Sequence, residues 1–206
     1  MKKSPEVSNA VIARLPKYYS LLISLREKGM KKISSTQIAE CLGYSPSQVR
    51  QDFSCFGEFG QHGYGYDIDN LIKNLAHLLD LDRNHNMVII GAGKLGQAIA
   101  HHQLYKKNNI HVKALFDIKE GIKSPDCPVY TMDKLGSFIK ENDIDVAMIA
   151  TDADSCQKII DDLYALGIRK VLNFVEIDVI TPPGMTVLNI NVMEGLYILF
   201  FKSLMK

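Results

Sequence analysis

A glycine-rich turn, Gly91-Ala92-Gly93-Lys94-Leu95-Gly96, constrains the fold of this chain more than any other segment. It follows the apolar run 87–90 and opens a helical pattern, which is the context of a strand, a turn and a helix in one βαβ unit. Gly91 would allow the tight turn, Gly93 the approach of a pyrophosphate, and Gly96 the packing of helix on strand. The N–H groups at a helix N-terminus suit phosphates. The turn therefore favours a dinucleotide site over a ligand-free connection.

Asp117 ends the next predicted strand, as expected for the acidic residue of such a unit. A carboxylate there can accept hydrogen bonds from the ribose hydroxyls of adenosine and repel a 2′-phosphate, which favours NAD(H) over NADP(H). Strands and helices then alternate, which predicts a parallel sheet with helices on both faces. The expected strands are 110–116, 128–130, 145–150, 169–174 and 186–190. The expected helices run from the turn to about 107, near 132–141 and over 153–166.

Residues before about 85 carry helical signals instead. Two short helices, 36–42 with Ser35 as its cap and 46–56 with Ser45 as its cap, are separated by Gly43 and match a helix-turn-helix. The spaced glycines of 57–67 predict a tight β-hairpin, or wing. Residues 1–60 hold nine basic and five acidic side chains, whereas the remainder holds 15 and 18. The positive excess suits a polyanion partner for this part of the chain.

The second of these helices is the expected recognition helix. Phosphate contacts are expected near its start and base contacts further along, with Arg50 suited to guanine and Gln51 to adenine. The wing tip can approach a phosphate or the minor groove. The candidate DNA-binding residues are Ser45, Ser47, Gln48, Arg50, Gln51 and His62. Spacing alone leaves open a small helical cap with ordinary polar surface residues.

Specific motifs recur along nearly the whole chain. They are Arg14-Leu15-Pro16, Gln48-Val49-Arg50, Phe56-Gly57-Glu58-Phe59-Gly60, Gly63-Tyr64-Gly65-Tyr66, the glycine turn, Phe116-Asp117 and Leu172-Asn173-Phe174. With these motifs the sequence resembles the Rex family of redox-sensing transcriptional repressors. The resemblance implies a homodimer on a palindromic DNA operator, without enzymatic activity. It also implies that NADH and NAD⁺ compete for one site and that NADH releases the DNA.

The expected fold class is therefore α/β, with a winged helix-turn-helix domain at 1–84 and a Rossmann domain at 85–190. Residues 191–206 are expected to form a dimerisation helix, because 192–204 is apolar nearly all round and the resemblance implies exchange between subunits. The expected cofactor-binding residues are Gly91, Ala92, Gly93, Lys94, Leu95, Gly96, Asp117, His102 and Thr151.

Three positions depart from the family pattern. His102 replaces a tyrosine near the nicotinamide, Thr151-Asp152-Ala153-Asp154 replaces an apolar turn, and Asn191 replaces an aspartate able to pair with Arg14 across the dimer. A divergent member could bind NAD⁺ and NADH alike, or another nucleotide. Two other classes stay open at this point: an NAD-dependent dehydrogenase, and the CoA-binding subunit of an acyl-CoA ligase.

Other polar residues give weaker signals. Asp152 and Asp154 favour helix capping over catalysis, and the pairs Asp143/Asp145 and Asp161/Asp162 favour solvated surface. One of His101 and His102 is expected to face the sheet or the site. No metal site is predicted, and Cys41, Cys55, Cys127 and Cys156 are expected to be reduced and mostly buried. No secretory or membrane-spanning pattern is evident, so a cytoplasmic location is expected.

Overall fold

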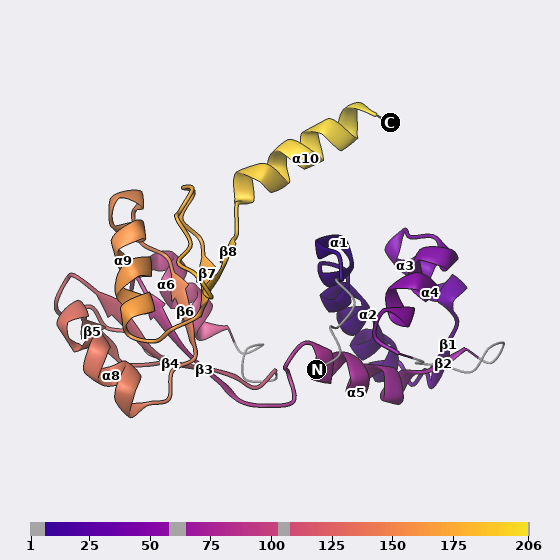
Figure 1. The fold of residues 1–206 in the computed structure, drawn as a ribbon, viewed down its shortest axis with the longest axis horizontal. Helices are drawn as coiled ribbons and strands as arrows, with labels where there is room; N and C mark the ends of the chain where they lie inside the picture. The colour runs from indigo at the N-terminus through magenta and orange to yellow at the C-terminus, as the bar shows by residue number, and fades with distance from the viewer. Residues whose placement is uncertain (1–6, 58–64, 103–107, 206) are drawn as a thin grey trace. The chain divides into compact units, whose positions relative to one another are not determined.

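The computed structural model describes residues 7–57, 65–102 and 108–205. The chain separates into two compact units, Met1–Arg83 and Asn84–Lys206, each with its own hydrophobic core (Figure 1). Within the described residues, no helix combines the length and the apolar character that crossing a bilayer requires.

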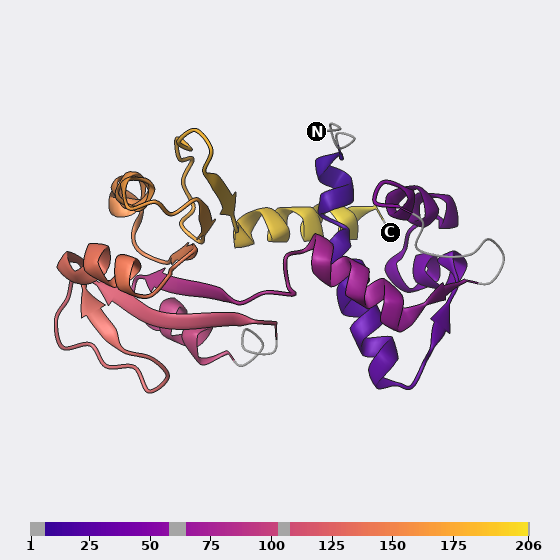
Figure 2. The same ribbon diagram turned by 60° about the horizontal axis from the view of Figure 1, so that its bottom comes forward.

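The N-terminal unit is mostly helical. Its elements are α1 (Asn9–Ile12), α2 (Leu15–Glu27), β1 (Lys32–Ile33), α3 (Ser35–Leu42), α4 (Pro46–Ser54), β2 (Tyr66–Asp67) and α5 (Ile68–Leu78). Helices α2 and α5 lie side by side (Figure 2), and their buried faces close the core over α3 and α4. Pro16 stands in the first turn of α2, where its missing N–H costs nothing, so the proline begins a new helix after α1.

Local chemistry sets the ends of α3 and α4. Ser34, and not the predicted Ser35, caps α3, because Gln37 bonds back to the Ser34 backbone and completes a capping box. Gly43 ends α3 in a left-handed conformation, with φ of 71°. Ser45 caps α4 as predicted. Helix α4 ends at Ser54, two residues early, because the next N–H groups bond three residues back.

The described residues of the predicted wing segment include Gly65 and strand β2. Strand β2 pairs with β1 in antiparallel register, Lys32 opposite Asp67 and Ile33 opposite Tyr66. Gly65 precedes β2 with φ of +73°, and a Cβ there would lie 2.8 Å from the carbonyl oxygen of Ile33, so this position requires glycine. Residues 58–64, with His62, lie outside the described residues, so the hairpin stays a prediction.

The C-terminal unit is an α/β Rossmann fold, which confirms the predicted class. Its strands are β3 (His85–Ile90), β4 (Ile110–Asp117), β5 (Val129–Thr131), β6 (Val146–Ile149), β7 (Lys170–Asn173) and β8 (Thr186–Asn189). They pair in parallel in the order β5-β4-β3-β6-β7-β8. The strand order reverses between β3 and β6, and such a switch point is where dinucleotide-binding sheets take their ligand.

Helices cover both faces of this sheet (Figure 1). They are α6 (Lys94–His101), the short 3₁₀ helix η1 (Met132–Lys134), α8 (Leu135–Glu141) and α9 (Ala153–Ala165). A last helix, α10 (Val192–Leu204), follows β8 and does not cover the sheet. Residues of α8 and α9 pack on one face with Val88 and Ile149, and residues of α6 pack on the other with Met87 and Met148. Helix α6 ends at His101, short of the predicted 107, because ψ of 112° at His102 is extended and breaks the helical ladder.

Two predictions about the burial of side chains were wrong. Asp145 is not simply solvated: its carboxylate accepts the N–H of Asn86 at 3.1 Å and lies 2.8 Å from the ring Nδ1 of the buried His85. Of the four cysteines only Cys156 is buried, while Cys41 is exposed. Neither feature leaves a signal in hydrophobic periodicity, because each depends on a neighbour that is distant in sequence.

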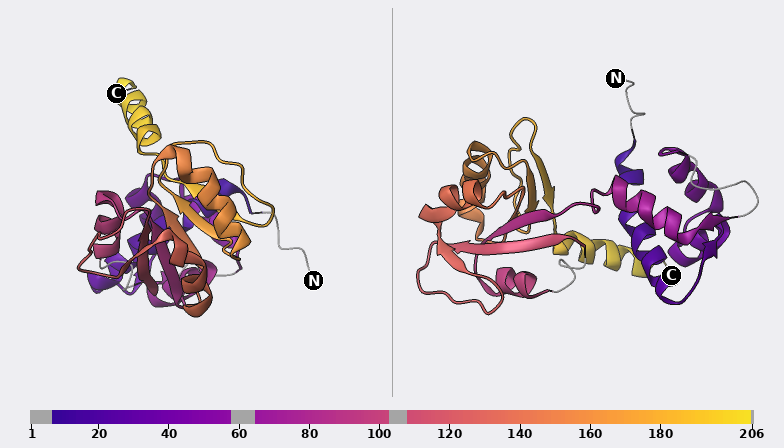
Figure 3. Two further views of the ribbon diagram at one scale, coloured as in Figure 1. Left: turned by 90° about the vertical axis from the view of Figure 1, so that its left-hand side faces the viewer. Right: turned by 90° about the horizontal axis from the view of Figure 1, so that it is seen from below.

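Helix α10 has the bounds predicted for it, and none of its residues is buried in the single chain. It starts three residues after β8 and continues outward from the end of that strand (Figure 3). Asn191 caps it by accepting the N–H of Glu194 at 3.1 Å. Its exposed large apolar side chains are Val192, Met193, Leu196, Tyr197, Ile198, Leu199, Phe200, Phe201 and Leu204.

Candidate functional site

The glycine turn between β3 and α6 contains two glycines that the fold itself requires. Gly91 has φ of +108°, and a Cβ there would overlap the carbonyl oxygen of Ala150. A Cβ on Gly96 would overlap the carbonyl oxygen of Gly91. Gly93 differs, because a Cβ there would meet nothing within 4 Å. The absence of a side chain at Gly93 therefore leaves open space at the N-terminus of α6.

Asp117, at the end of β4, holds the turn in place. Its Oδ2 accepts the backbone N–H of Ala92 at 2.8 Å, and its Oδ1 accepts that of Lys119 at 2.9 Å. The amide Nε2 of Gln97 donates to the carbonyl of Ala92 at 2.9 Å. Each carboxylate oxygen accepts one backbone bond here and keeps capacity for another. The acidic side chain is thus fixed beside the open turn.

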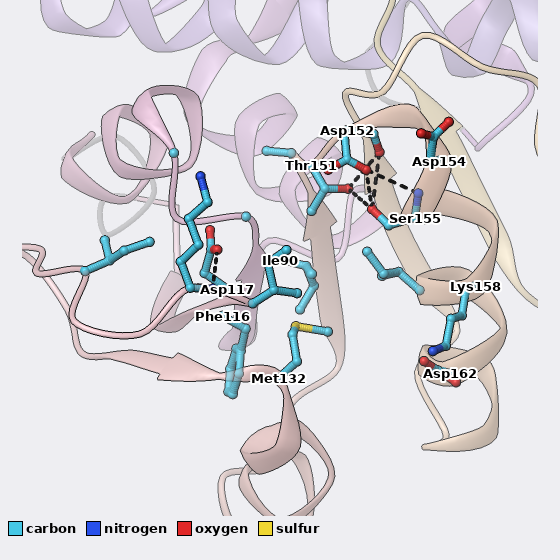
Figure 4. Close-up of a pocket in the computed structure, with 17 residues that line it drawn as sticks. Ile90, Phe116, Asp117, Met132, Thr151, Asp152, Asp154, Ser155, Lys158 and Asp162 are labelled. Carbon is cyan, nitrogen blue, oxygen red and sulfur yellow. Dashed lines mark hydrogen bonds between the residues drawn. The ribbon is translucent and has the colours of Figure 1, made fainter.

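A cleft of about 770 Å³ lies along the carboxyl ends of β3, β4 and β6 (Figure 4). Asp117 and the start of α9 lie on opposite sides of it, with Ile90 between them. The lining residues are Ile90, Gly91, Gly93, Phe116, Asp117, Ile118, Lys119, Ile122, Met132, Ala150, Thr151, Asp152, Asp154, Ser155, Lys158, Ile159 and Asp162. The floor is apolar and the rim is charged, which suits a planar base joined to polar groups.

The predicted cofactor residues divide into three groups. Gly91, Gly93, Asp117 and Thr151 line the cleft, whereas Ala92 and Gly96 are buried and do not line it. Lys94 and Leu95 are exposed in the first turn of α6 and do not line the cleft. His102 is exposed at the far end of α6 and also lies outside the lining.

The structure also places the histidine and aspartate residues that were singled out near the cleft. His101 is exposed and lies 2.9 Å from the carboxylate of Asp126, so neither adjacent histidine faces the sheet. Asp152 caps α9 as expected, and the hydroxyl and N–H of Ser155 lower its pKa by hydrogen bonding to the carboxylate. In the described part of the chain, no three His, Cys, Asp or Glu side chains gather as a metal site would require.

Sequence reasoning missed the wall that α9 contributes. Ser155, Lys158, Ile159 and Asp162 line the cleft, and their spacing of three, four and seven residues places them on one helix face. Asp162, expected on solvated surface, therefore belongs to the cleft rim. The helical spacing could have grouped these residues, but only the sheet order shows that this face turns toward Asp117.

The recognition-helix candidate α4 has two distinct faces. Val49, Asp52 and Phe53 are buried, whereas the opposite face is exposed. The exposed stripe consists of Ser47, Arg50, Gln51 and Ser54, at helical spacings of three, four and seven. Ser54 was not among the predicted residues. Ser45 and Gln48 lie at the helix start, where the Ser45 hydroxyl accepts the N–H of Gln48 at 3.2 Å.

Arg50 is fixed on this exposed face. Its Nη1 donates to the hydroxyl of Ser35, at the start of α3, at 3.1 Å. The bond links the two helices of the helix-turn-helix and holds the guanidinium beside the start of α3. A guanidinium in this position presents its remaining donors outward.

A buried carboxylate lies on the opposite face of the same helix. Asp52 is 2% exposed, and its Oδ2 and Oδ1 accept from Nε and Nη2 of Arg14 at 2.6 and 2.7 Å. The hydroxyl of Tyr18 donates to Oδ2 at 2.6 Å. Burial by itself raises the pKa of Asp52, but the bonds from Arg14 and Tyr18 outweigh burial, and this pKa lies below its ordinary value. Arg14 therefore has a carboxylate partner within its own chain.

Comparisons with known proteins cover both units. Residues 6–54 match the family described as "Putative DNA-binding protein N-terminus", and residues 82–177 match "CoA binding domain". The redox-sensing transcriptional repressor Rex of Clostridium botulinum (strain Alaska E43) is 40% identical over 205 residues, covering 98% of each chain. That of Clostridioides difficile (strain 630) is 40% identical over 204 residues, covering 98% of this chain and 97% of the relative.

Solved structures agree with these relatives. The crystal structure of RSP in complex with β-NAD⁺ and operator DNA has a TM-score of 0.89 and 38% identity, covering 95% of this chain and 92% of that one. RSP in complex with β-NADH has a TM-score of 0.87 and 36% identity, covering 96% and 94%. A third structure, described as RSP, a Rex-family repressor, also has a TM-score of 0.87.

A helix-turn-helix unit joined to a Rossmann unit with an open glycine turn defines a transcriptional regulator of the DNA-binding, nucleotide-sensing class. The chain belongs to the Rex family of redox-sensing transcriptional repressors. Because the similarity spans nearly its whole length, the chain is a regulator and not a dehydrogenase or a ligase subunit.

Proposed function

We propose that this protein is a cytoplasmic homodimer that binds a palindromic DNA operator through α3 and α4 and releases it when NADH occupies the cleft. One observation supports the binding of a nucleotide in the cleft. The Asp117 carboxylate is bonded to the backbone of the glycine turn, directly beside the open position at Gly93.

The cleft suits an adenine dinucleotide from end to end. A pyrophosphate can approach Gly93 and the free N–H groups at the start of α6. The remaining lone pairs of Asp117 can accept the ribose hydroxyls and would repel a 2′-phosphate, so NAD(H) is favoured over NADP(H). The apolar floor of Phe116, Met132 and Ile159 can take the adenine. The related RSP has been solved with β-NAD⁺ and with β-NADH.

The exposed stripe of α4 supports the proposed binding of DNA. Serine hydroxyls at the helix start can bind phosphates, and Arg50 and Gln51 can reach base edges. We add Ser54, which continues the stripe by one turn. The related RSP has been solved in complex with operator DNA.

Replacing Arg50 by alanine is expected to weaken operator binding by about 1–3 kcal/mol, because one base-reading contact is lost. The probe is a duplex that the wild-type protein enriches from a randomised pool, and the measurement is fluorescence anisotropy at fixed salt. Lys73→Ala removes the same charge from an exposed position on α5 and serves as the control. Equal losses in both variants would remove Arg50 from the base-reading set.

Helix α10 supports the dimer. A monomer would leave its apolar side chains in water on every side, with Tyr197, Phe200 and Phe201 each more than half exposed. Large exposed apolar patches of this kind mark protein interfaces. A second copy of the chain is the partner that the Rex family implies, with the helix exchanged between subunits.

Deleting residues 192–206 is expected to give a monomer whose sheet stays folded, because no residue of α10 contributes to the core. Sedimentation equilibrium and circular dichroism would measure mass and fold. Deletion of residues 205–206 alone is the control and is expected to stay dimeric. A dimer that survives loss of the whole helix would contradict the role given to α10.

A further inference from the structure

We propose that Arg14, Tyr18 and Asp52 form a positioning device that fixes the rotation of α4, so that its exposed stripe meets base edges in register. The inference rests on the proposed DNA binding by α4. None of the three side chains belongs to that stripe, and none was predicted as a DNA-binding residue.

The contacts join elements that are far apart in the sequence. Arg14 lies at the junction of α1 and α2, and Asp52 lies on the buried face of α4. Both carboxylate oxygens are taken by the guanidinium fork at 2.6 and 2.7 Å. The Tyr18 hydroxyl, from one turn further along α2, closes the group at 2.6 Å. Every bond therefore runs from α2 or its start to α4.

Aromatic rings brace the same helix. Tyr18 is completely buried and meets Phe53 of α4 edge to face, with ring centroids 5.0 Å apart. Tyr44, in the turn before α4, lies 6.0 Å from Tyr18. On its other side Phe53 meets Tyr66 of β2 at 5.1 Å. Ring contacts fill space but tolerate small rotations, whereas the bidentate ion pair has a directional geometry.

The chemistry of the pair points to position more than to stability. A buried ion pair stabilises a fold little compared with apolar residues of similar volume, because both charges lose water. Asp52 is 2% exposed and the Arg14 side chain 15%, so the carboxylate loses nearly all of its water and the guanidinium most of it. A planar fork on a carboxylate does fix angle and register, which an apolar contact does not.

Rotation of α4 bears directly on base reading. Asp52 follows Arg50 and Gln51 in the same helical turn, on the opposite face. Turning the helix about its axis therefore moves the buried carboxylate and the two base-reading side chains together. Base contacts require hydrogen-bond distances of about 2.7–3.2 Å, while phosphate attraction tolerates displacement. Loss of the device should then lower specific binding and spare non-specific binding.

The test is the double variant Arg14→Met/Asp52→Leu, which replaces the ion pair with apolar residues and leaves the net charge unchanged. We expect a melting temperature equal to or above that of the wild type. Affinity for a scrambled duplex should also be unchanged. Affinity for the duplex that the wild type enriches from a randomised pool should fall at least tenfold, at equal salt.

Arg14→Lys is the second variant, and it keeps the charge while removing the fork. It should stay folded and lose at least threefold in the ratio of enriched to scrambled duplex affinity. If the double variant does not fold, the ratio of enriched to scrambled duplex affinity in Arg14→Lys tests the positioning role by itself. An unchanged ratio in a folded variant would overturn the positioning role. A wild-type protein that enriches no duplex would instead overturn the proposed DNA binding itself, and the positioning role with it.

Discussion

Valine at Gly93 is expected to abolish the uptake of both NADH and NAD⁺ while the protein stays folded. A Cβ at this position would meet nothing within 4 Å in the free protein, and the side chain would project into the space where a pyrophosphate must approach. The loss should be at least about 100-fold, or about 2.8 kcal/mol. Isothermal titration calorimetry measures the loss, and the melting temperature reports the fold.

Two further variants separate binding from folding. Ala98→Val introduces the same side chain at an exposed position one turn along α6 and should bind dinucleotide normally. Gly96→Val should unfold the C-terminal unit, because its Cβ would overlap the carbonyl oxygen of Gly91. A folded Gly93→Val protein that binds dinucleotide as the wild type does would disprove the assigned position of the ligand.

Removing the buried carboxylate with Asp52→Ala is expected to lower the free energy of unfolding by about 3–5 kcal/mol, because the largely buried Arg14 guanidinium loses its partner. Urea denaturation of the full chain, followed by circular dichroism, measures the change. Glu40→Ala removes an exposed carboxylate from α3 and should change stability by no more than about 0.5 kcal/mol. A similar small change for Asp52→Ala would mean that removing Asp52 does not leave the Arg14 guanidinium desolvated and unpaired.

The stability lost in Asp52→Ala is also expected to depend on pH. Because the pKa of Asp52 lies below its ordinary value of about 3.9, ionisation of this group stabilises the folded state. That contribution is fully present above the unfolded pKa and is lost as the pH falls through the lower, folded pKa. The stability difference between the wild type and Asp52→Ala should therefore shrink on acidification below about pH 4. A constant difference would contradict the assignment.

Features that depend on residues close together in the sequence could be predicted from the sequence. The glycine turn and Asp117 could be placed because strand, turn and helix follow one another within a single βαβ unit. Ser45 and the bounds of α10 were predictable for the same reason, since capping and apolar patterning act locally. The exception is the cap of α3, where the capping box with Gln37 decided between two adjacent serines.

Features that depend on distant partners could not be predicted. Arg14 and Asp52 lie 38 residues apart, and no periodicity links them. The wall of α9 required the order of the strands, because only that order turns its Lys158 and Asp162 toward the cleft. His102 was predicted beside the nicotinamide and is not among the residues that line the cleft. The place of His102 beside the nicotinamide therefore stays a prediction.

The switch itself sets a quantitative requirement. NADH and NAD⁺ differ by one hydride and by the charge of one ring, and a ligand shifts a conformational equilibrium only by its differential affinity for the two states. Nearly complete release of the DNA would require a difference of about 10⁴-fold. Asp152 and Asp154, at the start of α9, bring negative charge to the cleft in place of the apolar turn that the family pattern implies.

Control of DNA binding by the cleft is tested most directly by titrating the preformed complex of protein and enriched duplex with NADH and, separately, with NAD⁺. We expect that NADH releases the DNA from the wild-type protein, that NAD⁺ does so only at much higher concentration, and that neither ligand affects Gly93→Val. Equal responses to the two nucleotides would show a divergent sensor. A wild-type complex that responds to neither would contradict the control of DNA binding through the glycine-turn cleft.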